Sequence, residues 1–168
     1  MFSKLVPDFY YHSLEEITPS MLRSLGIEAL VMDIDNTIVT YDDPLPTESA
    51  DRWFSDVTEA GIKISFVSNN NRERVNLFNS RLGYPAYAKS GKPFTKYILT
   101  AVADMGVKPE KTALIGDQIF TDILAGHRAG LAVCILVDPI KDKKSLFFRF
   151  KRLLEVPVKR YYGKRGSR

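Results

Sequence analysis

The sequence predicts an α/β fold in which helices cover both faces of a doubly wound, Rossmann-like parallel sheet, giving three α/β/α layers. Short apolar runs typical of buried central strands alternate with helical patterns, and each run ends at polar residues. The chain has 168 residues, of which 45% are hydrophobic, so it is long and apolar enough for one domain with its own core.

Four apolar runs are the predicted strands, at residues 29–32, 62–67, 112–115 and 132–137. The first ends at Asp33, the second at Ser68, and the third just before Asp117. Ligands of parallel α/β sheets gather beyond the carboxyl ends of the strands. We therefore expect these three side chains to meet at one binding site.

Four helices are predicted between the strands from their end residues and apolar spacing, at residues 47–61, 71–82, 93–106 and 120–129. Thr47 begins the first helix, and Pro93 suits the first turn of the third. Glycines follow or close the helices, as is typical of helix ends. The loop 41–46 follows the first strand and is in a position to shield the site.

Charge divides the chain into two parts. Residues 141–168 hold eleven Lys or Arg and two acids, whereas residues 1–140 carry a net charge of −5. We expect a catalytic domain over 1–140 and a basic amphipathic helix with its tail over 141–168. This helix either packs on the domain or binds anionic lipid as an interfacial anchor.

The expected compartment is the cytoplasm, with the tail able to hold the protein at the inner membrane face. Cys134 is the single cysteine, so the sequence gives no reason to expect an internal disulfide. No apolar run reaches the roughly 18 residues of a membrane-spanning helix. Pro7 and Asp8 interrupt the stretch in which a signal peptide needs apolar residues.

Asp33 and Asp35 place two carboxylates at the end of the first predicted strand. If the chain stays extended there, both leave the same face of the strand and repel each other. A divalent cation relieves this repulsion, and oxygen ligands without a nearby Cys or His favour Mg²⁺ over Zn²⁺. Asp117 supplies a further carboxylate, so the sequence predicts a Mg²⁺ site.

These residues also suit phosphoryl transfer. A carboxylate beside Mg²⁺ can attack phosphorus and form an aspartyl-phosphate, while a second acid protonates the leaving group and later deprotonates water. The phosphoryl oxygens need hydrogen-bond donors and positive charge. We expect Ser68, Asn69 and Lys92 to bind the phosphoryl group through a hydroxyl, a helix N-terminus and an ammonium.

Across about residues 28–137 the sequence resembles the four motifs of the haloacid dehalogenase (HAD) phosphatase superfamily, in family order. The matching segments are Asp33-Ile34-Asp35-Asn36-Thr37, Ser68, Lys92-Pro93, and Gly116-Asp117 with Thr121-Asp122-Ile123. The resemblance implies Asp33 as nucleophile and Asp35 as acid/base. It also implies Mg²⁺ held by the Asp33 carboxylate, the Asp35 carbonyl and Asp117, with Asp122 close by.

The motif spacing predicts a fold without a cap domain. Only 34 residues separate Asp33 from Ser68, and 23 separate Ser68 from Lys92. Each gap accommodates one helix with its connections, as in the capless subclass IIIA of the superfamily. An uncapped site admits a phosphate on a bulky or surface-bound molecule, unless a second subunit of an oligomer covers it.

The capless layout and the basic tail are similar to a bacterial branch that contains phosphatidylglycerophosphate phosphatases. That resemblance implies an anionic lipid headgroup as substrate. A phosphatase of soluble phosphoesters is the competing hypothesis. A third is a non-catalytic module that binds RNA or ribosomes through the tail, but it leaves the motif residues without a purpose, and we expect no nucleic-acid partner.

Two assignments have alternatives within the sequence. Lys89 lies close to Lys92 and could be the phosphate ligand instead, but Pro93 after Lys92 matches the motif. Asp122 could serve only the dipole of its own helix, because acids are common in first turns.

Overall fold

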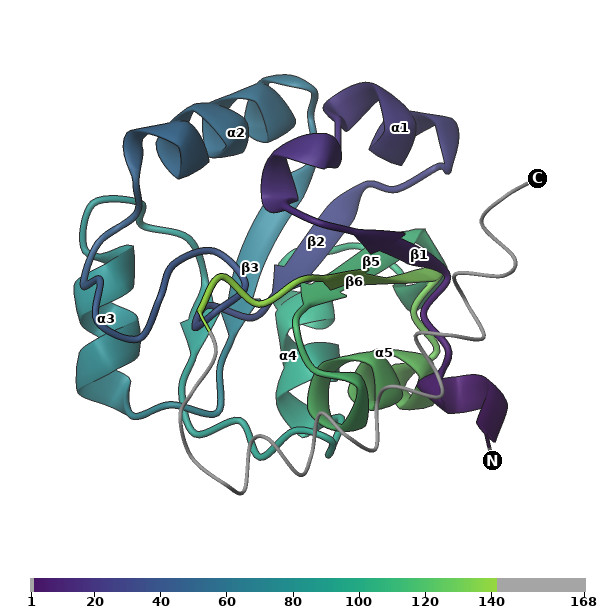
Figure 1. Ribbon diagram of the computed structural model, residues 1–168. Coiled ribbons are helices and arrows are strands. Elements are labelled where there is room, and N and C mark those ends of the chain that lie inside the picture. Colours follow the sequence, from purple (N-terminus) through teal and green to yellow (C-terminus); the bar gives the residue numbers. More distant parts are fainter. Residues whose placement is uncertain (1, 142–168) are drawn as a thin grey trace.

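The computed structural model describes residues 2–141 and is built around a six-stranded sheet in which all paired strands are parallel (Figure 1). The strands are β1 (Phe9–Tyr11), β2 (Ala29–Met32), β3 (Lys63–Val67), β4 (Ala86–Tyr87), β5 (Thr112–Gly116) and β6 (Val133–Val137). Their order across the sheet is β1-β6-β5-β2-β3-β4. The four predicted strands are confirmed and occupy the centre, and two short strands form the edges.

Helices lie on both faces of the sheet. They are α1 (Pro19–Ser24), α2 (Glu48–Glu59), α3 (Arg72–Asn79), α4 (Lys96–Asp104) and α5 (Leu124–Ala129), with short turns η1 (Phe2–Leu5), η2 (Leu14–Glu16), η3 (Pro109–Lys111) and η4 (Ile119–Ile123). Figure 1 shows α1 and α2 on one side of the sheet and α4 and α5 on the other. Because Val75 and Phe78 of α3 pack in the same cluster as α2, α3 covers that face too. The predicted three α/β/α layers are confirmed.

Strand β2 shows why the sequence folds this way. Leu30 and Met32 pack into the core cluster under α2, and Ala29 and Val31 pack into the cluster under α4 and α5. All four side chains are fully buried. A strand with helices on both faces needs apolar residues at every position, so its sequence is a continuous apolar run.

The predicted helix ends are confirmed for α2, where the Thr47 hydroxyl accepts a hydrogen bond from the backbone N–H of Ala50 at 3.2 Å. They are wrong for the helix expected from Pro93, since α4 begins at Lys96. The backbone N–H of Phe94 donates to the Gly91 carbonyl at 3.0 Å and closes a turn around Pro93. This turn delays the helix by three residues.

Two other helices differ from their predicted bounds. Helix α3 ends at Asn79 instead of residue 82, because the Asn79 carbonyl accepts from the N–H groups of both Leu82 and Gly83 in a closing turn. The fourth predicted helix is divided into a π-helical turn, η4, and the α-helix α5. Its predicted end is confirmed, since Gly130 follows α5 in the left-handed conformation that glycine adopts without strain.

The structure confirms the absence of a cap domain between the first three motifs. Residues 33–92 are all described, and they contain only a loop, α2, β3, α3 and β4. Of the tail, only Lys141 is described, so the predicted amphipathic helix lies outside the described residues. Within residues 2–141, every helix is too short or too polar to span a bilayer.

Candidate active site

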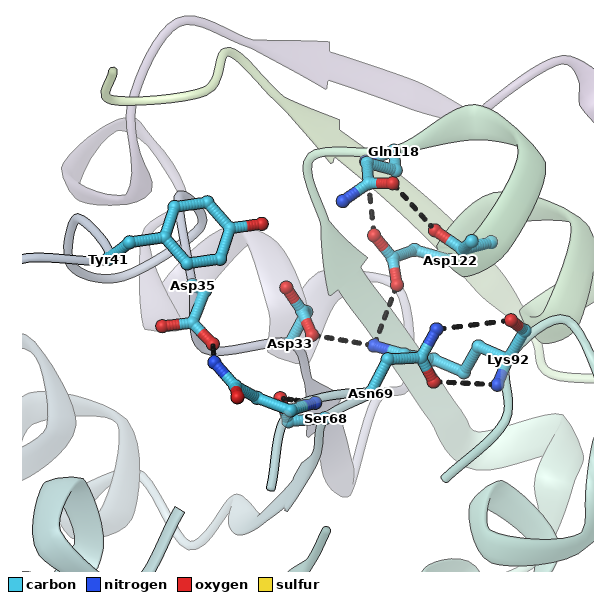
Figure 2. Close-up of a pocket in the computed structure, with 10 residues that line it drawn as sticks. Asp33, Asp35, Tyr41, Ser68, Asn69, Lys92, Gln118 and Asp122 are labelled. Carbon is cyan, nitrogen blue, oxygen red and sulfur yellow. Dashed lines mark hydrogen bonds and ion pairs between the residues drawn. The ribbon is translucent and has the colours of Figure 1, made fainter. Parts of the chain in front are cut away.

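The carboxyl ends of β2, β3 and β5 lie at one edge of the sheet and bring Asp33, Ser68 and Asp117 to the same region, as predicted. A cavity of about 350 Å³ opens there (Figure 2). Every residue that lines it carries a polar or charged group, and these residues are Asp33, Asp35, Tyr41, Ser68, Asn69, Asn70, Lys92, Gln118, Thr121 and Asp122.

Lys92 connects two of the carboxylates at the base of the cavity. Its Nζ lies 2.7 Å from Oδ1 of Asp33 and 2.7 Å from Oδ1 of Asp122. Burial raises the pKa of Asp33 to about 7, although Lys92 acts to lower it. Burial alone would lower the pKa of Lys92, but the charges of Asp122 and Asp33 outweigh it and hold that pKa above its usual value. Lys92 is therefore a buried cation.

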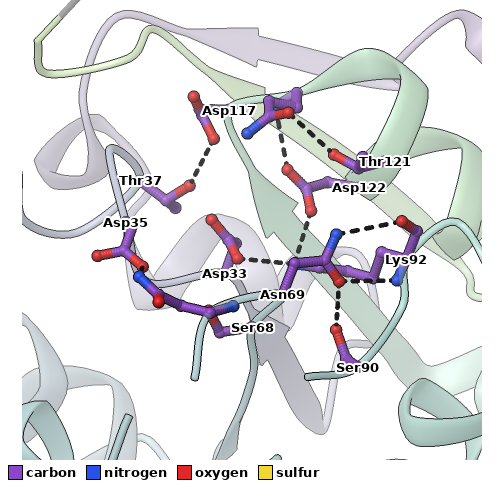
Figure 3. Close-up of polar contacts among 12 residues, drawn as sticks. Asp33, Asp35, Thr37, Ser68, Asn69, Ser90, Lys92, Asp117, Thr121 and Asp122 are labelled. Atoms are coloured by element: carbon purple, nitrogen blue, oxygen red, sulfur yellow. Dashed lines mark hydrogen bonds and ion pairs between the residues drawn. The ribbon is translucent and has the colours of Figure 1, made fainter. Parts of the chain in front are cut away.

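The carboxylates of Asp33, Asp117 and Asp122 form the buried carboxylate cluster. One oxygen of each lies within 4.8 Å of the others, and the three residues are 8%, 3% and 1% exposed (Figure 3). Lys92 forms ion pairs with two of the three carboxylates, those of Asp33 and Asp122. Buried like charges at this separation are unfavourable without a cation, and an all-oxygen donor set suits Mg²⁺. The residues present therefore fit a hard divalent ion.

The chain turns sharply just after Asp35, at residues 36–39. The N–H of Asn36 donates to the Val39 carbonyl at 2.6 Å, and Asn36 has a left-handed φ of 65°. Asparagine tolerates this conformation better than most residues. The turn brings Val39 back beside Asp35, where the two residues form a β-bridge.

The Asp35 carboxylate has partners of its own. Its Oδ2 accepts from Nδ2 of Asn70 at 2.9 Å, and its Oδ1 accepts from Nε of Arg74 at 2.9 Å. Nη2 of Arg74 lies 2.9 Å from the same oxygen. We call these three residues the Asp35–Arg74 group. Arg74 therefore offsets the charge of the Asp35 carboxylate.

The residues predicted to bind phosphate have distinct places. Oγ of Ser68 faces the cavity and accepts from the backbone N–H of Asn70 at 3.1 Å. Oδ1 of Asn69 accepts from Oγ of Ser90 at 2.7 Å and from the N–H of Lys92 at 2.8 Å. Nδ2 of Asn69 donates to the Lys92 carbonyl at 3.1 Å. Both polar atoms of the Asn69 side chain thus hold the loop that carries Lys92.

The two lysines considered as phosphate ligands, Lys89 and Lys92, differ in burial and in contacts. Lys92 is 6% exposed and reaches Asp33, whereas Lys89 is exposed and does not line the cavity. Asp122 likewise does more than favour a helix dipole, because its Oδ2 accepts from the Gln118 N–H at 3.0 Å while its Oδ1 pairs with Lys92.

Sequence reasoning missed several residues of the site. Gln118 and Thr121 line the cavity beside the predicted acids, and their position next to Asp117 and Asp122 was the available signal. Tyr41 also lines it, from the loop expected beside the site, and burial with nearby acids raises its pKa, so its hydroxyl is neutral. The sequence around Arg74 gives no comparable indication of a role in the site, because only the folded loop brings Arg74 to Asp35.

Comparisons with known proteins agree with this geometry. A family model described as HAD-hydrolase-like matches residues 89–144. The Bacillus subtilis protein named "Probable phosphatase YqeG" is 39% identical over 150 residues, which cover 89% of this chain and 87% of that protein.

Two solved structures share the fold. The cobalt-bound deoxy-D-mannose-octulosonate 8-phosphate phosphatase YrbI of Haemophilus influenzae has a TM-score of 0.54 at 15% identity, covering 66% of this chain and 68% of that one. A 3-deoxy-D-manno-octulosonate 8-phosphate phosphatase of Moraxella catarrhalis, bound to magnesium, phosphate and its sugar acid, has a TM-score of 0.50 at 13% identity, covering 69% and 71%.

Proposed function

The chain belongs to the HAD-like superfamily of phosphatases, and from this premise we propose that it is a Mg²⁺-dependent phosphomonoesterase that works through a phosphorylated Asp33. Family membership decides between an enzyme and a non-catalytic module in favour of the enzyme. The observation that carries the proposal is the convergence of Asp33, Lys92 and the other buried carboxylates on one cavity.

In the proposed first step, an oxygen of Asp33 attacks phosphorus as the bond from phosphorus to the ester oxygen breaks. Asp35 gives its proton to that leaving oxygen. Lys92 and the Ser68 hydroxyl hold the phosphoryl oxygens, on which negative charge must be stabilised during transfer.

In the second step, a water molecule attacks the phosphorus of the aspartyl-phosphate while Asp35 accepts its proton. The bond from phosphorus to Asp33 breaks, inorganic phosphate leaves, and Asp35 is protonated again. Asp33, Asp117 and Asp122 would hold Mg²⁺, with the Asp35 carbonyl as a further ligand. The bound ion would supply positive charge to the phosphoryl oxygens and offset the repulsion within the buried carboxylate cluster.

Turnover of p-nitrophenyl phosphate tests this proposal. We expect activity with Mg²⁺ and none with EDTA, and we expect Asp33→Asn to abolish turnover while the protein still unfolds cooperatively. Asp56→Asn is the matched control, because Asp56 is an exposed acid on α2. Wild-type turnover by Asp33→Asn would overturn the proposal.

For the substrate, we propose the phosphomonoester of an anionic lipid headgroup, such as phosphatidylglycerophosphate. Support comes from the absence of a cap over residues 33–92 and from the eleven basic residues after 140. Phe94 adds to it, since this side chain is 75% exposed in the turn directly after Lys92. An exposed aromatic residue two positions after a cavity-lining lysine is suited to insertion into a lipid interface.

Two measurements test the lipid proposal. Full-length protein should sediment with anionic vesicles at low salt and remain in the supernatant with neutral ones. Phe94→Ser should lower turnover of the lipid in vesicles about three- to tenfold and leave p-nitrophenyl phosphate turnover unchanged. Leu77→Ser is the control, because Leu77 is 50% exposed on α3.

The second candidate substrate is a soluble phosphoester, such as the phosphorylated sugar acids named for the two solved structures of the same fold. A panel of soluble phosphoesters and the lipid, all assayed with Mg²⁺, separates the two candidates. A higher kcat/KM on a soluble substrate, together with no vesicle binding, would favour the second.

A further inference from the structure

Arg74 is a nearly buried arginine that lines neither the cavity nor the buried carboxylate cluster. Its side chain is 12% exposed, and it lies in the first turn of α3, where it contacts the cavity-lining residue Asp35. The superfamily motifs quoted above do not include it. An arginine this deep in a protein needs partners for its donors, and those partners indicate its role.

The guanidinium of Arg74 makes contacts to two parts of the chain. Nε and Nη2 hold one carboxylate oxygen of Asp35, each at 2.9 Å. Nη1 donates to the Pro44 carbonyl at 3.1 Å, and Nη2 donates to the Thr40 carbonyl at 3.2 Å. Arg74 therefore joins the Asp35 carboxylate to the loop that follows it, and Asn70 holds the second oxygen of that carboxylate.

We propose that Arg74 is a positioning residue for Asp35, and that it holds the Asp35 carboxylate in the orientation needed to reach the leaving group. This inference rests on the proposed function. Two guanidinium nitrogens hold one carboxylate oxygen and Asn70 holds the other, so the planar guanidinium fixes the direction of the Asp35 side chain. The contacts to the loop carbonyls of Thr40 and Pro44 keep the guanidinium itself in place.

The proposal predicts a dependence on the leaving group. An alkoxide leaves poorly unless it is protonated, whereas p-nitrophenolate leaves well without a proton. In Arg74→Met we expect kcat/KM to fall about 10- to 100-fold for an alkyl phosphomonoester and less than about threefold for p-nitrophenyl phosphate. The value of kcat/KM is the proper quantity, because it reports the steps up to release of the leaving group.

Matched variants distinguish a loss of Asp35 positioning from a loss of folding. Arg72→Met is the control, since Arg72 is an exposed arginine two residues earlier on the same helix. Arg74→Lys keeps the charge with a single ammonium and should recover part of the activity on the alkyl substrate. In an Asp35→Asn background, Arg74→Met should have no further effect on kcat/KM.

The outcomes are distinct. Equal losses on both substrates in Arg74→Met and Arg74→Lys, or a full further loss in the Asp35→Asn background, would overturn the role of Arg74. Should Arg74→Met fail to fold, Arg74→Lys and its double variant with Asp35→Asn give the same comparison. Wild-type turnover by Asp33→Asn would instead overturn the proposed function itself.

Discussion

The buried carboxylate cluster and the Asp35–Arg74 group both contribute residues to the lining of one cavity but differ in charge balance. The cluster has three carboxylates and one ammonium from Lys92, whereas the group has one carboxylate and one guanidinium. The cluster therefore offers a site that could hold a further cation, and the group does not. The comparison assigns the metal of the proposed function to the cluster, and assigns Arg74 as the partner of the remaining carboxylate.

Removing Lys92 should give the largest effect, because it takes away the only protein cation that contacts the cluster among the described residues. We expect Lys92→Met to lower kcat/KM on p-nitrophenyl phosphate about 10²- to 10³-fold, through loss of charge next to the phosphoryl group. Lys89→Met is the control and should stay within about threefold. The opposite ranking of these two variants would show that Lys89 is the phosphate ligand.

Neutralising one carboxylate in each region should change stability in opposite directions without metal. Asp35→Asn leaves Arg74 nearly buried without its anionic partner and should lower the free energy of unfolding by about 2–3 kcal/mol. Asp117→Asn relieves repulsion within the cluster and should raise it by about 1 kcal/mol. Urea unfolding in EDTA measures both, and changes of the same sign would contradict the charge comparison.

Magnesium should act on the cluster alone. At a concentration of about 100 times its Kd, Mg²⁺ should stabilise the wild-type protein by about 2.7 kcal/mol, a rise in Tm of roughly 5–10 °C. We expect Asp117→Asn to lose most of this rise and Asp56→Asn to keep it. A rise in Asp117→Asn equal to that of the wild type would place the metal elsewhere.

The pKa of Asp33 predicts how stability changes with pH in the absence of metal. Its folded value, about 7, lies above its ordinary value of 3.8. The folded state therefore holds a proton that the unfolded state has released, and stability contributed at low pH is lost as the pH rises toward 7. In the Asp33→Asn variant, the amide side chain neither binds nor releases a proton in this pH range.

Unfolding of the wild type and Asp33→Asn in EDTA at several pH values checks this. The stability of the variant relative to the wild type should increase by about 1–3 kcal/mol between pH 4 and pH 7, and stay level above pH 8. A difference that is constant across this range would show that Asp33 keeps its ordinary pKa.

The centre of the fold was predictable from the sequence because β2, β3, β5 and β6 are buried on both faces and leave continuous apolar runs. The edge strands β1 and β4 were missed, since they have three and two residues of intermediate burial and no apolar run. Their pairing depends on the finished sheet, which supplies the neighbouring strand.

The candidate site, like the fold, has residues that could be predicted from the sequence and contacts that could not. Asp33, Ser68 and Asp117 could be predicted because each directly follows a central strand, whose direction fixes where the side chain lies. The contacts of Asn69 and Arg74 could not, because they depend on the turns at residues 36 and 91–94. Local sequence does not determine how such loops meet across a site.

A search for the covalent intermediate tests the central claim most directly. Full-length protein is mixed with Mg²⁺ and p-nitrophenyl phosphate, quenched in acid within the first turnover, digested and analysed by mass spectrometry. We predict one added phosphoryl group on the peptide that contains Asp33, and none in Asp33→Asn. A phosphoryl group on another residue, or turnover with no phosphorylated peptide at any quench time, would contradict the account.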